Sequence, residues 1–149
     1  MNFEFEKIFK SDVCAAKTIV AELIAGLRSH REVSDDDETD LRLILSELLY
    51  NAVVHGNKND TQKLVTVRVT LEHESEVLLK CEIADQGEGF SHKKFFAEYG
   101  NKDILESDHG RGVWLAASLT EDFAYNESGN SVTFSKRLSG KTAAGGANG

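Results

Sequence analysis

Three segments that lie far apart in the chain, residues 47–56, 85–89 and 110–112, hold the side chains best suited to chemistry. The first places an acid, an amide and an imidazole four residues apart. The second is an acid followed by two glycines, and the third is a pair of glycines before an apolar stretch. An amide oxygen can bind Mg²⁺, a carboxylate can accept a hydrogen bond from the amino group of adenine, and glycine backbone can approach phosphates closely. Together the segments predict a binding site for Mg-ATP.

The first segment places polar groups where the core of a helix is expected. At about 100° per residue, Glu47, Asn51 and His55 step about 40° each toward the apolar face formed by residues 41–52. Partly buried polar groups cost free energy unless neighbouring strands, backbone or a ligand satisfy them. Three such groups in register, followed by Gly56, favour a ligand. Asn51 would then suit Mg²⁺, and Glu47, one turn earlier, could accept a proton from an attacking hydroxyl or water.

The second segment should lie at the end of a strand. Asp85 directly follows the apolar strand expected at 77–83, so its carboxylate is predicted to lie beside a pocket. An ionised carboxylate only accepts hydrogen bonds, which suits the exocyclic amino group of adenine. Gly87 and Gly89 would let the backbone approach the base closely or adopt a positive φ. An ordinary turn that contains an aspartate is the alternative interpretation of this segment taken alone.

The third segment, residues 110–112, comes immediately before Val113 and the apolar residues that follow it. Gly110 and Gly112 would expose backbone N–H groups at the start of a helix, where phosphates bind readily. The side chain of Arg111 either contacts a phosphate or faces solvent. Because glycine pairs also enter helices for structural reasons, this segment predicts a phosphate site only in combination with the other two.

The spacing of apolar residues predicts the elements that position these segments. Helical spacing indicates helices at 11–30, with Ser11 as N-cap, and at about 36–55, with Ser34 or Asp35 as N-cap and Gly56 as the stop. Alternation and short apolar runs give strands at 3–9, 65–71, 77–83, 123–126 and 131–136, a hairpin connection at 73–76, a helix at 113–119, and a short helix around Phe95, Phe96 and Tyr99. This order predicts a two-layer α/β sandwich, in which helices cover one face of a mostly antiparallel sheet.

Composition limits the class of protein. The 149 residues are expected to form one domain over residues 1–138, followed by a small, polar, glycine-rich and flexible tail at 139–149. The net charge of −8, with acids concentrated at 35–40, argues against nucleic acid as a direct partner, because phosphate binding needs a basic surface. Cys14 and Cys81 lie far apart in the sequence, and we expect both to be reduced thiols. No apolar run approaches the roughly 20 residues that cross a bilayer. We therefore expect a cytoplasmic protein with no membrane partner.

Taken in order, the three segments resemble the N, G1 and G2 boxes of the GHKL superfamily, which comprises gyrase, heat-shock chaperones, histidine kinases and mismatch-repair ATPases. The resemblance extends from about residue 3 to residue 138 and implies the Bergerat ATP-binding fold. The spacing of Glu47, Asn51, His55 and Gly56, the short segment between the G1 and G2 boxes, and the stretch 121–130 resemble one branch more closely. That branch is the bacterial anti-sigma factor serine/threonine kinases.

Members of this branch phosphorylate a serine of a small anti-anti-sigma protein of the STAS-domain type and, in another state, hold a sigma factor. The resemblance therefore implies an ATP-dependent protein serine kinase in a partner-switching system of transcription regulation, with ATP and Mg²⁺ as cofactors. Such kinases are commonly dimers, so a homodimer is implied as well. The implied site consists of Glu47 as general base, Asn51 as Mg²⁺ ligand, Asp85 with Gly87 and Gly89 at the adenine, Gly110 and Gly112 with their neighbours Arg111 and Val113 at the phosphates, and Ser131 as a hydroxyl near the adenine.

Other functions stay open at the level of the sequence. The pocket could bind nucleotide only to order the loop at 90–110, which would make the protein a partner-switch module without kinase activity. The segments could also serve packing alone, in a scaffold that binds no nucleotide, but this explanation needs three separate coincidences. A histidine kinase would need a phosphoacceptor histidine, and the first helix offers only His30, near its end and without an acidic neighbour before it. Kinases of this type also act outside sigma control, so the partner could be another regulator.

Overall fold

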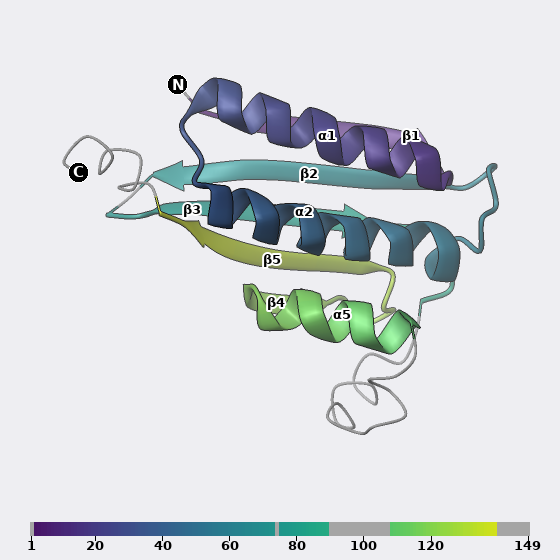
Figure 1. The fold of residues 1–149 in the computed structure, drawn as a ribbon. Helices are drawn as coiled ribbons and strands as arrows, with labels where there is room; N and C mark the ends of the chain where they lie inside the picture. The colour runs from purple at the N-terminus through teal and green to yellow at the C-terminus, as the bar shows by residue number, and fades with distance from the viewer. Residues whose placement is uncertain (1, 74, 90–107, 140–149) are drawn as a thin grey trace.

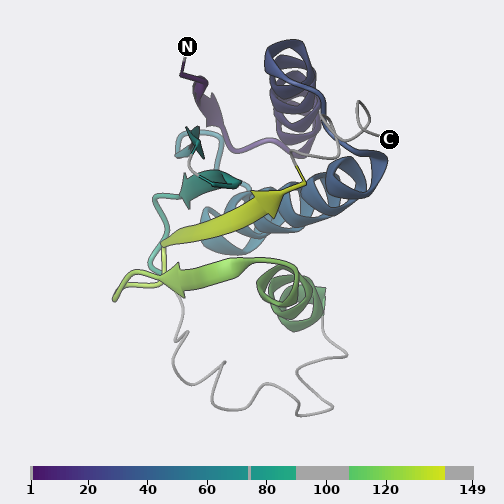
Figure 2. The same ribbon diagram turned by 90° about the vertical axis from the view of Figure 1, so that its left-hand side faces the viewer.

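The computed structural model describes residues 2–73, 75–89 and 108–139 and arranges them in two layers (Figure 1). The strands are β1 (Glu4–Lys10), β2 (Leu64–His73), β3 (Val77–Ala84), β4 (Glu121–Tyr125) and β5 (Ser131–Leu138). The helices are α1 (Val13–His30), α2 (Asp35–Tyr50), its π-helical continuation η1 (Asn51–Gly56), and α5 (Asp108–Ser118). Figure 2 shows the helices together on one face of the sheet. The predicted class, an α/β sandwich with an antiparallel sheet, is confirmed.

The strands form a single antiparallel sheet in the order β1-β2-β3-β5-β4. Side chains alternate between its two faces, so that the paired Val67 and Ile83 are buried beneath the helices. The next residues along, Arg68 and Glu82, pair on the opposite face, where Arg68 also binds Glu6 of β1. The helix-covered face therefore holds the core, and the functional elements must be sought between that face and the helices.

Capping residues set the starts of the first two helices. Of the two predicted N-caps of α2, Ser34 takes the position, because its hydroxyl accepts a hydrogen bond from the backbone N–H of Asp37 at 3.0 Å. The predicted N-cap of α1 was wrong by one residue, since Asp12 caps the helix by accepting from Cys14 N. Ser11 is buried instead, and its hydroxyl donates to the carbonyl oxygen of Lys63 at 2.8 Å. A bond to the residue that precedes β2 thus takes the serine that local sequence assigns to the cap.

The second helix changes its hydrogen bonding at Asn51. The N–H of Asn57 donates to the carbonyl oxygen of Ala52 at 2.8 Å, a span of five residues that defines a π turn. Because a π turn is wider than an α turn, a step of four residues no longer advances toward the apolar face. Asn51 is buried, but His55 is exposed and its ring lies 6.1 Å from that of Tyr50. The predicted stripe of three polar groups is therefore wrong at His55.

The remaining predicted elements agree with the structure where it describes them. The hairpin of β4 and β5 forms, and α5 covers the predicted helix at 113–119 apart from Leu119, but begins earlier, at Asp108. The short helix expected around Phe95 lies outside the described residues, as do residues 140–149 of the expected tail. Ser139 is described, and its backbone N–H donates to the buried carboxylate of Asp37 at 2.8 Å. In the described part of the chain, no helix is long and apolar enough to cross a bilayer.

Candidate nucleotide-binding site

The first two predicted segments meet directly. η1 ends at Gly56, and a Cβ atom added there would overlap the carboxylate of Asp85. A Cβ atom at Gly87 would in turn overlap the carbonyl oxygen of Gly56. The turn that follows β3 therefore packs against the end of η1 with no room for side chains at either glycine. This contact brings the helix that carries Asn51 next to the predicted adenine acceptor.

Gly89 has a separate structural requirement. Its φ of 87° lies in the left-handed region, and a Cβ atom there would overlap the carbonyl oxygen of Ser128. The loop between β4 and β5 thus lies against the turn after β3. Asn130 of the same loop accepts from the backbone N–H of Asp85 at 2.9 Å and donates from its side chain to the carbonyl of Gly87 at 3.2 Å. These contacts fix the backbone on both sides of Asp85.

Asn51 carries an unsatisfied oxygen. The residue is 8% exposed, and its Oδ1 is the buried side-chain polar atom without a hydrogen-bond partner among the described residues. A buried carbonyl oxygen left without a partner costs about 1–3 kcal/mol, so an isolated amide gains from a ligand there. A hard cation is such a ligand, and Mg²⁺ typically takes one or two protein oxygens together with phosphate oxygens and water. Within the described residues no cluster of three or more His, Cys, Asp or Glu could hold a metal.

Asp85 is held in a partly buried position. Its Oδ1 accepts from the N–H of Gly87 at 2.8 Å. Burial raises the pKa of the carboxyl above its ordinary value, and the bond from Gly87 opposes this only in part. Burial raises the pKa of the Tyr125 phenol, and the nearby charge of Asp85 raises it further. A carboxylate has further lone pairs beyond this one bond, so Asp85 can accept a hydrogen bond from the amino group of a base.

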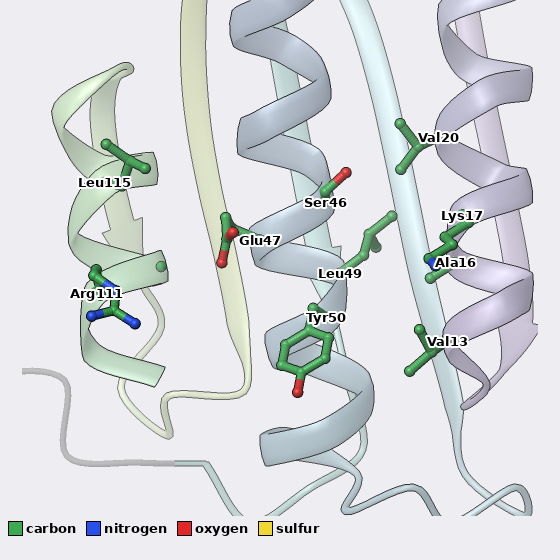
Figure 3. A pocket seen from close by; sticks show the side chains of 11 residues that line it. Val13, Ala16, Lys17, Val20, Ser46, Glu47, Leu49, Tyr50, Arg111 and Leu115 are labelled. Carbon is green, nitrogen blue, oxygen red and sulfur yellow. The ribbon is translucent and has the colours of Figure 1, made fainter. Parts of the chain in front are cut away.

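Glu47 lies between α2 and α5, beside a cavity of about 430 Å³ (Figure 3). Figure 3 shows its carboxylate on the side of α2 that faces α5, where Arg111 projects. A Cβ atom at Gly112 would overlap Glu47 Oε1, so this glycine allows the two helices to approach. The cavity is mostly apolar and is lined by Val13, Ala16, Lys17, Val20, Ser46, Glu47, Leu49, Tyr50, Arg111, Gly112 and Leu115. An acid beside an open cavity can accept a proton from a hydroxyl that enters it.

The third segment differs from its prediction. Gly110 and Gly112 lie inside α5 rather than before it, because the helix begins at Asp108. Only the first four N–H groups of a helix lack partners within it, so Gly110 can still offer its N–H to a phosphate. Gly112 is the fifth residue of the helix and lies just beyond these groups, and it instead makes room for Glu47. Val113 is 1% exposed and packs in the interior, and Arg111 is exposed at the cavity.

Ser131 is not brought into this group. It pairs with Ala84 across the sheet, but its hydroxyl donates to Glu82 at 3.3 Å. Because Glu82 pairs with Arg68 on the open face of the sheet, the hydroxyl of Ser131 points away from the helix layer. The predicted contact between this hydroxyl and adenine gains no support from the structure.

Residues 9–136 match the family described as the histidine kinase-like ATPase domain. The chain belongs to this family. An anti-sigma F factor of Bacillus licheniformis is 27% identical over 144 residues, which cover 93% of this chain and 92% of that protein. The serine-protein kinase RsbW of the same organism is 30% identical over 127 residues, covering 80% of this chain and 77% of the relative. RsbW of Bacillus subtilis (strain 168) is 29% identical over 131 residues, or 83% and 79%.

A solved structure has the same fold. The crystal structure of the RsbU and RsbW domains of Rv1364c from Mycobacterium tuberculosis superposes with a TM-score of 0.59 at 19% identity. The match covers 91% of this chain and 32% of that longer chain. At this identity the likeness establishes the fold of the ATPase domain alone.

Sequence reasoning missed several polar residues that build the site of this histidine kinase-like ATPase domain. Asn57 and Asn130 bond to the turn around Asp85, and Gln86 of that turn accepts from the N–H of Leu64. Each lies beside a glycine or in a loop, where polar residues are expected for ordinary reasons. The one available signal was position, since Asn57 directly follows the Gly56 that ends the first segment and Gln86 lies between Asp85 and Gly87.

Proposed function

We propose that this ATPase domain is an ATP-dependent protein serine kinase of a bacterial partner-switching system. Its substrate would be a serine of a small anti-anti-sigma protein of the STAS type, and it would sequester a sigma factor or another regulator. The main support is the position of Glu47, which lies one turn before the unsatisfied oxygen of Asn51 and lines an open cavity. The relatives named anti-sigma F factor and serine-protein kinase RsbW support the same class.

The residues of the site would divide the work of binding. Asp85 would accept a hydrogen bond from the adenine amino group, and Asn51 would hold a Mg²⁺ ion that the nucleotide also contacts. When bound, Mg²⁺ neutralises phosphate charge and orients the terminal phosphate. The N–H of Gly110, in the first turn of α5, would face a phosphate oxygen, and Arg111 would supply a cationic contact.

Glu47 would act on the acceptor. A serine of the partner would enter the cavity between α1, α2 and α5 and place its hydroxyl at the Glu47 carboxylate. The carboxylate accepts the hydroxyl proton while the serine oxygen forms a bond to the terminal phosphorus and the bond from that phosphorus to ADP breaks. The products are a phosphoserine, ADP and a protonated Glu47, which returns its proton to solvent.

The test is transfer of a phosphoryl group to a purified candidate partner with ATP and Mg²⁺, followed by mass spectrometry. The partner should gain about 80 Da, which is the mass of one phosphoryl group, and this group carries about two negative charges. Glu47→Ala should abolish this gain while ATP binding, measured by calorimetry, is kept. Glu22→Ala removes an exposed glutamate of α1 that pairs with Lys7 of β1; it is the matched control and should transfer normally.

The outcomes separate the candidate functions. Transfer by Glu47→Ala at the wild-type rate would contradict the role of this residue. Nucleotide binding without transfer by the wild type would favour the alternative, a partner-switch module without kinase activity. Absence of both would leave a scaffold.

The proposal includes two properties of the assembled protein. A homodimer and a cytoplasmic location follow from the branch that the sequence resembles, and light scattering of the purified chain tests the dimer. The net charge of −8 is consistent with partners other than nucleic acid.

A further inference from the structure

A single buried amide joins the segments of the site. Asn57 directly follows η1 and is 1% exposed. Its Oδ1 accepts from the backbone N–H of Gln86 at 2.7 Å, and its Nδ2 donates to Ser11 Oγ at 2.7 Å and to the carbonyl oxygen of Leu64 at 3.0 Å. Its own backbone N–H closes the π turn by bonding to Ala52 O. The side chain thus contacts three separate segments of the chain.

The bond to Gln86 acts on the turn that carries Asp85. Gln86 lies between Asp85 and Gly87, and its N–H is the group that Asn57 holds. The side-chain oxygen of Gln86 accepts from the N–H of Leu64 at 2.7 Å, so the turn is tied to the start of β2 as well. Ser11 fixes the other side of Asn57, because its hydroxyl donates to Lys63 O and its backbone N–H bonds to the same oxygen.

These bonds set the distance between the turn that carries Asp85 and the end of η1. The close contacts at the glycines leave no room to change that distance. Gly56 touches the Asp85 carboxylate and Gly87 touches the carbonyl of Gly56, so a shift of the turn would cause overlap in one direction and a gap in the other. Asn51 begins the π turns that Asn57 closes. The position of Asp85 relative to the unsatisfied oxygen of Asn51 is therefore fixed through Asn57.

We propose that Asn57 is a positioning residue of the nucleotide site, which sets the spacing between the Asp85 acceptor and the Asn51 oxygen. The inference rests on the proposed function, because it assumes that both residues contact one nucleotide. In this role Asn57 would contact neither nucleotide nor metal, because its side chain is buried and bonds within the protein. A purely structural role would seal the corner between β1, β2 and η1 without any effect on the affinity of the folded chain for nucleotide.

The experiment compares two variants that remove different parts of the Asn57 bracket, the hydrogen bonds that the Asn57 side chain makes with Gln86, Ser11 and Leu64. Asn57→Ala removes the acceptor for Gln86 N–H, whereas Ser11→Ala removes one of the two Nδ2 partners and keeps that acceptor. Dissociation constants for ADP with Mg²⁺ are measured by calorimetry at a temperature where circular dichroism shows both variants folded. Asn57→Ala should bind roughly tenfold more weakly than the wild type, while Ser11→Ala should stay within about twofold.

A second readout reports the bracket directly and needs no ligand. Hydrogen exchange of the Gln86 amide should be slow in the wild type and in Ser11→Ala and should accelerate in Asn57→Ala, with the amides of central β2 unchanged. If Asn57→Ala does not fold, Asn57→Ser keeps a shorter hydroxyl at the position and should show the same two effects to a smaller degree.

The outcomes distinguish this inference from the proposed function. A wild-type chain that binds no nucleotide would overturn both. A wild-type chain that binds ADP, with Asn57→Ala equally tight or with equal losses in both variants, would overturn the positioning role alone. Unchanged exchange at Gln86 in Asn57→Ala would also overturn it.

Discussion

Two amides, at the first residue of η1 and directly after its last, differ in how their hydrogen-bonding groups are satisfied. Asn57 uses its Oδ1 once and its Nδ2 twice within the protein. Asn51 is also buried, but its Oδ1 has no partner among the described residues. Buried polar groups are almost always paired, so a saturated amide indicates a structural part and an orphaned oxygen indicates a place for a ligand. The contrast supports the proposals that Asn51 contacts a ligand and that Asn57 positions the site.

Replacing Asn51 should therefore separate binding from stability. Asn51→Ala removes the proposed Mg²⁺ ligand, so ATP affinity should fall to the level that the wild type shows without Mg²⁺ and should no longer respond to the ion. Because an unsatisfied buried oxygen costs about 1–3 kcal/mol, the free energy of unfolding should be unchanged or higher in the variant. Calorimetry with and without Mg²⁺ and urea unfolding check the two parts. Unchanged Mg²⁺ dependence would contradict the metal role.

Ionisation of Asp85 should have opposite effects on stability and on nucleotide binding. Burial raises the pKa of its carboxyl from the ordinary value of 3.8. The folded chain then holds the proton to higher pH than the unfolded chain, so stability falls as pH rises through this range and ionised Asp85 is costly at neutral pH. Asp85→Asn should unfold at higher urea than the wild type at pH 7, and the difference should shrink toward about pH 3, where both side chains are neutral.

The same variant should bind ATP roughly tenfold more weakly, since a neutral amide is a poorer acceptor than a carboxylate. Urea unfolding at the two pH values and calorimetry at pH 7 provide the measurements. If the variant is less stable than the wild type at pH 7, and this deficit shrinks on acidification, the sign of the pKa shift is wrong.

At the scale of elements, periodicity predicted the strands and helices but not how they change or meet. The alternation in β2 and the helical spacing in α2 were sufficient, because burial on one face of an element repeats regularly. The π turn at Asn51 could not be predicted, since an extra residue in one turn leaves no periodic signal in six residues. Ser11 was misassigned because its partner, Lys63, is 52 residues away. The bracket at Asn57 was missed for the same reason.

The contact between α2 and α5 gives a prediction at this scale. Gly112→Ala would place a methyl group on Glu47 Oε1, the end of a flexible side chain that can move aside. The fold should survive and gain up to about 1 kcal/mol, because alanine is the better helix former, but phosphoryl transfer should fall at least about tenfold as Glu47 is displaced.

Gly26→Ala is the control for this effect. Gly26 lies within α1, and a Cβ atom there would meet only a ring atom of Phe3 at 3.8 Å, an ordinary contact. It should give a similar rise in melting temperature with wild-type transfer. Full transfer activity in Gly112→Ala would argue against the placement of Glu47 as the base.

Across the whole molecule, the residues of the proposed site gather at one end of the central strands of the sheet. Asp85 follows β3, Asn130 precedes β5 and Leu64 begins β2, and the sheet order places these three strands side by side. η1 reaches the same end of the sheet from the helix layer, and Ser11, in the turn between β1 and α1, bonds to Asn57 there. Segments from most of the chain thus converge there, so a nucleotide would bind to the folded arrangement and have no comparable site in the unfolded chain.

Nucleotide should therefore stabilise the molecule as a unit. A ligand present at about 100 times its dissociation constant adds about 2.7 kcal/mol when it binds only the folded state. Thermal unfolding of the wild type should stay a single transition whose midpoint rises with the concentration of ATP and Mg²⁺. Gly87→Ala should abolish the rise, because its Cβ would overlap the backbone oxygen of Gly56 and push the Asp85 turn away from η1. Gly26→Ala should keep it. A rise that survives in Gly87→Ala would place the nucleotide elsewhere on the chain.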